Sequence, residues 1–293
     1  MRIVLATRRS PLALAQTGAV ADALRAAGHA PELLELTTTG DRWSAAGTGA
    51  APDKGLFVKE LEEALLDGRA DLAVHSAKDL PGELPEGLVI AAVPVREDPR
   101  DVVVAPPGGL AALPAGARVA TGSPRRAAQV LAARPDLVVV PIRGNVGTRL
   151  DKLARGDADA LVLAAAGLAR LGLSPEGAEA LPPEVSTPAP GQGLLAVEGR
   201  AGDPAAAAAA AALDDPGAHA CLRAERALLA ALGGGCMEPV GALCEPHGAG
   251  LRLTAFAGTP DGARAERVTV EGAAGDPEGL AAEAAALLAA VRP

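Results

Sequence analysis

Alternating strand-like and helix-like segments dominate the first two-thirds of this 293-residue chain. Arg2–Thr7, Glu32–Thr38 and Asp71–Val74 are β-rich runs, and a helical segment lies between each consecutive pair. Each of these helical segments ends at a glycine, which is the usual residue just after a helix C-terminus. Because such alternation joins parallel strands through crossover helices, the sequence predicts a βαβ lobe with a mostly parallel sheet.

The same order of elements returns later in the chain. Strand-like runs at Arg118–Thr121, Leu137–Ile142 and Asp159–Ala164 again alternate with helices. Ser10-Pro11 and Ser123-Pro124 open the first helix of each set, with serine suited to the N-cap and proline to the first helical position. The repetition predicts two related α/β lobes.

Proline-rich segments connect the two lobes. Val93–Arg100 and Leu181–Pro190 are interpreted as crossovers, and Leu194–Glu198 as a strand that returns to the first lobe. Two crossovers make a hinge around a cleft, and such clefts bind ligands at strand C-termini and helix N-termini. Within the first lobe, the Gly/Ala/Thr/Asp-rich segment Thr37–Gly55 is expected to be a long mobile loop. The predicted domains are a first α/β lobe of residues 1–95 and 194–213, a second α/β lobe of residues 100–189, and a small C-terminal α+β domain of residues 216–293.

Composition excludes several classes of protein. A surface that binds nucleic acid by base stacking needs aromatic side chains, and these make up 1% of the chain. A net charge of −9 also disfavours a general phosphate-backbone binder. No apolar stretch is long enough for a membrane helix. Arg8-Arg9 loosely mimics a twin-arginine export signal, but the apolar run after it is short. With three cysteines and no disulfide framework, we expect a cytoplasmic protein.

A cluster of basic residues nevertheless lies inside this acidic chain. Residues 118–155 contain eight basic side chains and two acidic ones, and seven of the eight are arginine. Arg125 and Arg126 follow Ser123-Pro124, where free backbone N–H groups and the helix dipole already attract anions. Arg143 and Arg149 flank a second turn that leads into a helix. A solvated basic face would explain a single arginine, but the set predicts a ligand with several carboxylates or phosphates.

His75-Ser76-Ala77-Lys78-Asp79 follows directly after the predicted strand Asp71–Val74. Catalytic groups in open α/β folds lie at such strand ends. The corresponding end in the second lobe, Ala164-Ala165-Ala166-Gly167, carries no reactive group. The alternative is that Asp79 is simply a turn residue before Leu80-Pro81. Since only the first lobe carries reactive groups at this strand end, the difference between the lobes favours a reaction centre in the first lobe.

Cys236 follows three glycines. Because glycine has no side chain, a bulky group could come close to the Cys236 thiol. A buried free cysteine is the simpler interpretation. Zinc is a further alternative, since His219, Cys221, Cys236, Cys244 and His247 fall close together, but the paired spacing of zinc ligands is absent. We expect no metal site.

Several of these motifs together resemble one enzyme family. The motifs are Gly55-Leu56-Phe57-Val58-Lys59-Glu60-Leu61, His75-Ser76-Ala77-Lys78-Asp79, Arg96-Glu97-Asp98-Pro99-Arg100-Asp101, Arg143-Gly144-Asn145-Val146-Gly147-Thr148-Arg149, Pro190-Gly191-Gln192-Gly193 and Gly234-Gly235-Cys236. In this order they resemble the porphobilinogen deaminase (hydroxymethylbilane synthase) family. The resemblance implies two α/β lobes like those of periplasmic binding proteins around a hinged cleft, plus a small C-terminal α+β domain.

The resemblance also implies a transferase activity and a set of site residues. Four porphobilinogen molecules would be joined head to tail with loss of ammonia, on a dipyrromethane cofactor attached covalently to Cys236. Asp79 would be the catalytic residue, stabilising the cation left when ammonia departs. The cofactor and substrate carboxylates would be held by Arg8, Ser10, Lys54, Ser76, Lys78, Thr121, Ser123, Arg125, Arg126, Arg143, Arg149 and Gln192.

Partners follow from the same resemblance. We expect a monomer that binds porphobilinogen, contacts neither nucleic acid nor membrane, and hands its product to uroporphyrinogen-III synthase. The alternative is a non-enzymatic two-lobed protein that binds a polycarboxylate ligand, which would explain the hinge and the arginine cluster but not Cys236.

Overall fold

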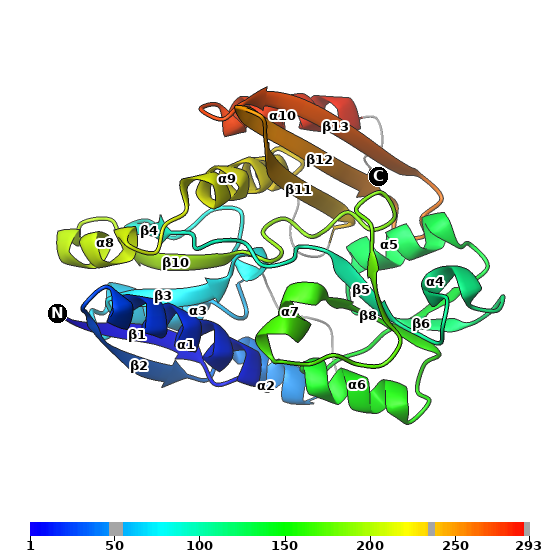
Figure 1. Cartoon of the computed structure of the whole chain (residues 1–293), viewed down its shortest axis with the longest axis horizontal. Helices are drawn as coiled ribbons and strands as arrows, with labels where there is room; N and C mark the ends of the chain where they lie inside the picture. Colours follow the sequence, from blue (N-terminus) through cyan, green and yellow to red (C-terminus); the bar gives the residue numbers. More distant parts are fainter. Residues whose placement is uncertain (47–54, 234–237, 290–293) are drawn as a thin grey trace.

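Three β-sheets organise the molecule (Figure 1). The computed structural model describes residues 1–46, 55–233 and 238–289. Two five-stranded sheets form the cores of two lobes, and a three-stranded sheet forms a C-terminal domain that lies over both of them (Figure 1).

The first lobe has a mixed sheet in the order β2-β1-β3-β10-β4. β1 runs parallel to β2 and β3, whereas β10 runs antiparallel to β3 and β4. Apolar side chains of α1, α8 and the central strands form one buried cluster on this sheet. The elements of the lobe are β1 (Arg2–Arg8), α1 (Pro11–Ala26), β2 (Ala30–Leu36), α2 (Thr39–Ala46), α3 (Lys59–Leu66), β3 (Leu72–Ser76), β4 (Leu88–Ala92), β10 (Leu195–Arg200) and α8 (Pro204–Ala211).

The second lobe has a sheet of the same design, in the order β7-β6-β8-β5-β9. β6 runs parallel to β7 and β8, and β5 runs antiparallel to β8 and β9. In both lobes, the strand at the fourth position enters the sheet directly after a crossover between the lobes. The elements are β5 (Asp101–Val104), α4 (Gly109–Ala112), β6 (Arg118–Ala120), α5 (Pro124–Ala133), β7 (Val138–Val140), α6 (Val146–Ala154), β8 (Ala160–Ala164), α7 (Ala165–Arg170) and β9 (Ala178–Leu181).

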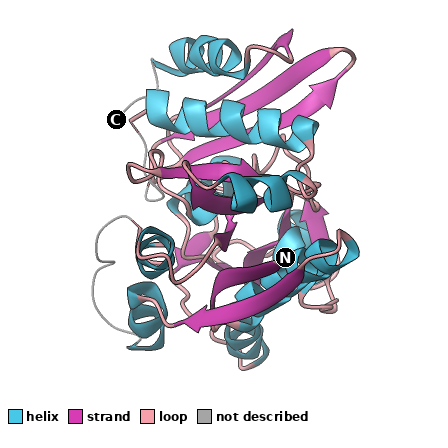
Figure 2. Ribbon diagram, turned by 90° about the vertical axis from the view of Figure 1, so that its left-hand side faces the viewer, coloured by secondary structure: helices cyan, strands magenta, loops and turns pink. Residues whose placement is uncertain are grey.

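The C-terminal domain packs two helices on one face of an antiparallel sheet (Figure 2). The sheet order is β11-β12-β13, and apolar residues of all three strands meet those of the helices in one core. Its elements are α9 (Pro216–Ala231), β11 (Val240–His247), β12 (Gly250–Gly258), β13 (Ala265–Ala273) and α10 (Pro277–Leu288). The predicted fold class, two α/β lobes plus a small α+β domain, is confirmed.

The two crossovers are residues 93–100, between β4 and β5, and residues 182–194, between β9 and β10. They are hydrogen-bonded to each other. The Glu97 N–H donates to the Gly193 carbonyl at 3.1 Å. Gly193 has a φ of +85°, and a Cβ there would come within 2.4 Å of the Glu97 carbonyl oxygen. Only glycine avoids that collision, which gives a structural reason for the glycine at this point of the hinge.

The segment 37–55, predicted as a loop, contains the helix α2. Thr38 and Asp41 form a reciprocal cap, in which the Asp41 N–H donates to Thr38 Oγ1 at 3.2 Å and the Thr38 N–H donates to Asp41 Oδ2 at 3.1 Å. This Thr-x-x-Asp pattern acts as a capping box and was present in the sequence. For residues 39–46 the loop prediction was therefore wrong; residues 47–54 lie outside the described part of the chain.

Candidate active site

A large cavity lies between the two lobes. It has a volume of about 1160 Å³, at or above the roughly 300–1,000 Å³ of most small-molecule sites. The first lobe contributes residues from the end of β1, the start of α1 and the turn after β3, and the second lobe contributes the segments 141–149 and 163–173 among others. The cavity thus has room for a ligand larger than one small ring.

The cavity is strongly cationic. Of the described residues that line it, six are basic and two are acidic. The basic side chains come from both lobes, so a ligand between the lobes meets positive charge from two sides. The basic residues are Arg8, Lys78, Arg126, Arg143, Arg149 and Lys152, and the acidic ones are Asp41 and Asp79.

Two helix N-termini from opposite lobes add to this positive character. Ser10 caps α1 by accepting the Ala13 N–H at 3.3 Å, and Asn145 caps α6 by accepting the Thr148 N–H at 2.8 Å. Ser10 and Asn145 both line the cavity. Since the first turn of a helix carries free N–H groups and the positive end of the dipole, both helix starts favour anionic groups in the cavity.

Lys78 and Asp79 lie in a 3-10 turn that follows the last residue of β3, Ser76. The pKa of Lys78 is lowered to about 8, chiefly by burial and next by the nearby charge of Arg126, while the charge of Asp79 opposes the shift. Burial likewise lowers the pKa of Arg149, Arg126 adds to that effect, and Asp79 opposes it. The charge of Asp79 therefore acts on cations from both lobes, and all three side chains line the same cavity.

Arg8 meets two partners that the sequence did not suggest. Its Nη2 donates to Asp41 Oδ1 at 2.5 Å, and its guanidinium lies over the ring of Phe57 at 4.2 Å from the ring centroid. Burial alone would raise the pKa of Asp41, but the hydrogen bond and charge of Arg8 outweigh it and lower that pKa. Asp41 thus occupies the position next to Arg8 that a ligand carboxylate would take.

Five of the predicted carboxylate-binding residues are not among the described residues that line the cavity. Ser76 accepts a hydrogen bond from Gln16 at 2.9 Å, Thr121 accepts the Ser123 N–H at 3.1 Å, and Ser123 caps α5. Arg125 is buried and donates to Asp101 and to the Thr187 carbonyl, and Gln192 donates to Asp101 and to the Pro99 carbonyl. Arg125 and Gln192 are thus buried and bonded to Asp101, which also binds the cavity-lining Arg126.

Two predicted site residues, Lys54 and Cys236, lie outside the described part of the chain. The other two cysteines, Cys221 and Cys244, are buried in the core of the C-terminal domain. Within residues 1–46, 55–233 and 238–289, no group of three or more His, Cys, Asp or Glu side chains is arranged to hold a metal ion.

Several functional candidates were not predicted from the sequence. Asp41, Phe57 and Asn145 line the cavity, and Asp101 binds both Arg125 and Arg126. Lys152, which belongs to the predicted basic cluster of residues 118–155, also lines the cavity. Asp101 closes the motif Arg96-Glu97-Asp98-Pro99-Arg100-Asp101, so the signal was present. Its role depends on residues far away along the chain.

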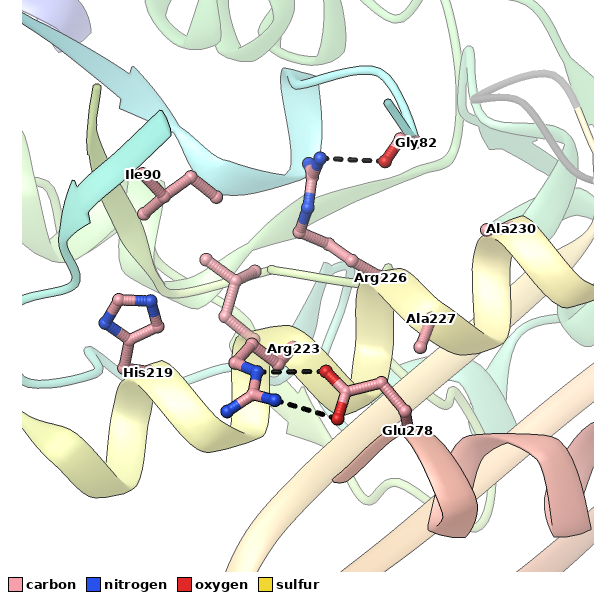
Figure 3. A pocket seen from close by; sticks show the side chains of 9 residues that line it. Gly82, Ile90, His219, Arg223, Arg226, Ala227, Ala230 and Glu278 are labelled. Carbon is pink, nitrogen blue, oxygen red and sulfur yellow. Dashed lines mark hydrogen bonds and ion pairs between the residues drawn. The ribbon is translucent and has the colours of Figure 1, made fainter. Parts of the chain in front are cut away.

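A smaller cavity of about 230 Å³ lies between α9, α10 and the first lobe (Figure 3). Its polar groups are turned toward each other: Arg223 donates twice to Glu278, at 2.9 Å each, and Arg226 donates to the Gly82 carbonyl at 2.8 Å. In Figure 3, Arg226 reaches from α9 toward the first lobe. This cavity marks the contact of the C-terminal domain with the first lobe.

None of the described helices is both long enough and apolar enough to cross a membrane.

Comparison with known proteins gives a consistent result. The model of the family "Porphobilinogen deaminase, dipyromethane cofactor binding domain" matches residues 3–208, and that of "Porphobilinogen deaminase, C-terminal domain" matches residues 219–290. The porphobilinogen deaminase of Roseiflexus castenholzii is 53% identical over 281 residues, which is 95% of this chain and 92% of that protein. That of Acidothermus cellulolyticus is 52% identical over 288 residues, which is 96% of this chain and 87% of that protein.

Among solved structures, the methionine-binding protein MetQ has a TM-score of 0.47 and 14% identity, covering 72% of this chain and 89% of that chain. Both family models match this chain, and about half of its residues are identical to those of porphobilinogen deaminases over nearly its whole length. These matches set aside the alternative of a non-enzymatic polycarboxylate-binding protein. The chain belongs to the porphobilinogen deaminase family, transferases with a dipyrromethane cofactor that act in tetrapyrrole biosynthesis.

Proposed function

We propose that the cavity between the lobes is where this enzyme holds porphobilinogen and the growing pyrrole chain. The observation that carries the proposal is the set of six basic side chains, drawn from both lobes, around Asp79. Each pyrrole unit carries two carboxylates, so a chain of rings needs many cationic partners. Arginine is suited to this because its guanidinium binds a carboxylate through two hydrogen bonds.

The residues present fit a dipyrromethane cofactor. Two linked pyrroles bring four carboxylates, and the cavity offers basic side chains together with the N-termini of α1 and α6. We assign its covalent attachment to Cys236, and the binding of its carboxylates and those of the substrate to Arg8, Ser10, Lys78, Arg126, Arg143 and Arg149. When bound, the cofactor supplies the free ring carbon to which the first substrate is joined. Lys54, Ser76, Thr121, Ser123, Arg125 and Gln192 complete the assignment by resemblance, and of these Arg125 and Gln192 are buried and bonded to Asp101.

Asp79 is assigned the catalytic role. Loss of ammonia from porphobilinogen leaves a positive charge on the ring and its methylene group. A carboxylate in a cavity shielded from water stabilises that charge far more than one in bulk solvent. Asp79 also accepts hydrogen bonds from pyrrole N–H groups in this assignment, while the surrounding cations hold the carboxylates and keep the reacting ring in place.

Intact mass tests the covalent attachment. We expect the active protein to exceed the mass of its sequence, 28.9 kDa, by the mass of two pyrrole units. The excess should remain in denaturing solvent, because a thioether does not dissociate, and should map to the peptide that contains Cys236. An active chain with the mass of the bare sequence would refute the attachment.

Substrate capture should weaken as the pH rises through about 8. With its pKa lowered to about 8 by burial, and by Arg126 and Arg125 against the opposing Asp79 and Asp101, Lys78 is charged below that pH and neutral above it. A neutral amine attracts a carboxylate less, so kcat/KM, which reports on groups of the free enzyme, should fall on the alkaline side. In Lys78→Arg the guanidinium stays charged, and this fall should disappear. An unchanged alkaline limb in Lys78→Arg would contradict the assignment.

We further propose that the enzyme works as a monomer in the cytoplasm and passes its linear tetrapyrrole to uroporphyrinogen-III synthase. The acidic net charge of −9 supports the expectation of no nucleic-acid partner.

A further inference from the structure

The carboxylate of Asp101 is the most highly bonded buried group behind the cavity. Asp101 begins β5 and is fully buried. Its Oδ2 accepts from Arg125 Nη1 at 2.8 Å and from Ser186 Oγ at 2.7 Å. Its Oδ1 accepts from Arg126 Nε at 2.9 Å, Arg126 Nη2 at 2.7 Å and Gln192 Nε2 at 2.9 Å. Five hydrogen bonds therefore meet on one side chain.

Asp101 and its partners belong to three separate parts of the fold. Arg126 comes from the first turn of α5 and lines the cavity. Ser186 and Gln192 belong to the second crossover, and Asp101 itself directly follows the first crossover. The carboxylate thus joins the hinge segments to a side chain in the wall of the cavity.

The charges in this cluster do not cancel. Burial alone would raise the pKa of Asp101, but the charges and hydrogen bonds of Arg125 and Arg126 hold it well below its ordinary value. Two guanidinium groups and one ionised carboxylate leave one net positive charge beside the cavity. All three guanidinium nitrogens of Arg126 donate hydrogen bonds, because its Nε and Nη2 donate to Asp101 and its Nη1 donates to the Val162 carbonyl at 3.2 Å.

We propose that Asp101 is a positioning residue for carboxylate recognition, fixing the guanidinium of Arg126 in the cavity wall and linking its position to both crossovers. The inference rests on the proposed function of the cavity. Without Asp101, Arg125 and Arg126 would be two buried cations with no counter-charge between them, and Arg126 would be driven out of its place in the wall. Asp101 acts through Arg126 and does not contact the ligand.

The test compares Asp101→Asn with Asp159→Asn. Asp159 is a matched control because, like Asp101, it lies at the start of a strand of the second lobe, directly before β8, and binds an arginine. Its partner is Arg118, and this pair lies on the surface. We expect Asp101→Asn to raise the KM for porphobilinogen about 10-fold or more, the effect of losing one charge-assisted contact. The fraction of chains that carry the cofactor, read from intact mass, should fall, while kcat per loaded chain changes little. Asp159→Asn should leave all three values near wild type.

A double variant separates positioning from simple stability. Asp101→Asn/Arg126→Gln removes one charge of each sign, so the cluster regains its net charge and Tm should rise above that of Asp101→Asn. If Asp101 acts through Arg126, the KM of the double variant equals that of Arg126→Gln alone, since coupled residues are not additive. A KM that returns to wild type together with Tm would overturn the inference, as would a wild-type KM in Asp101→Asn. If Arg126→Gln itself has a wild-type KM and full cofactor loading, the proposed function of the cavity fails, and this inference with it.

Discussion

Replacing Asp79 with asparagine should lower kcat by about 100-fold or more in a chain that still folds. Removing one group that stabilises charge in a transition state typically costs roughly 10²–10³ in rate. Asparagine keeps the shape of the side chain but removes the negative charge that faces the cation of the reacting ring. Asp79 is one of two acidic side chains among the described residues that line a cavity with six basic ones. Only Asp41 could therefore supply another negative charge from this set to stabilise the cation. The measurement is kcat per cofactor-loaded chain, with loading taken from intact mass.

Asp41→Asn is the matched control for this experiment. Asp41 is the other acidic residue of the cavity and pairs with Arg8. Its loss frees Arg8 for ligand carboxylates, so its effect should fall mainly on KM. Substantial kcat in Asp79→Asn would remove the catalytic role from Asp79. Equal losses of kcat in the two variants would mean that the cavity needs negative charge in general and not Asp79 in particular.

Local chemistry made much of the fold predictable. Serine followed by proline predicted the starts of α1 and α5, and in both helices the serine side chain accepts the backbone N–H that the prediction requires. The alternation of strands and helices predicted the parallel part of each sheet. These features depend on neighbours within one turn or one strand, so a single sequence contains them.

Features that depend on distant partners were not predictable. β4, β5 and β9 were missed because short strands at or near a sheet edge have little pattern of their own, and the tertiary sheet supplies their partners. The position of Lys78 and Asp79 in the cavity follows from the end of one strand and was predicted. The pairing of Arg125 with Asp101 crosses 24 residues, so the local sequence gives no sign of it, and the ligand contact of Arg125 stays a prediction. The role of Cys236 stays a prediction.

Replacing Glu225 with glutamine should destabilise the protein by about 3–5 kcal/mol, the usual cost of breaking a buried ion pair. Glu225 lies on α9 and is fully buried. Its carboxylate accepts from Arg96 Nη1 at 2.6 Å, from the Gly191 N–H at 2.6 Å and from the Cys244 N–H at 2.7 Å. These partners lie on the first crossover, the second crossover and β11, so one side chain fastens the C-terminal domain to the hinge. Glutamine has one acceptor oxygen in place of two and leaves Arg96 without its counter-charge.

Thermal unfolding measures this effect, and a fall in Tm on the order of 10 °C is expected for a protein of this size. Glu278→Gln is the control, because Glu278 also binds an arginine, Arg223 of α9, but in an exposed pair. Such pairs contribute about 1 kcal/mol or less, so Glu278→Gln should change Tm by only a few degrees. Both variants remove the negative charge of a carboxylate that binds an arginine, but only Glu225 is buried and only Glu225 joins the C-terminal domain to the two crossovers. If the two variants unfold at the same temperature, Glu225 does not fasten the domain to the hinge. If Glu225→Gln is the less stable, as expected, the buried carboxylate of Glu225 fastens the C-terminal domain to both crossovers.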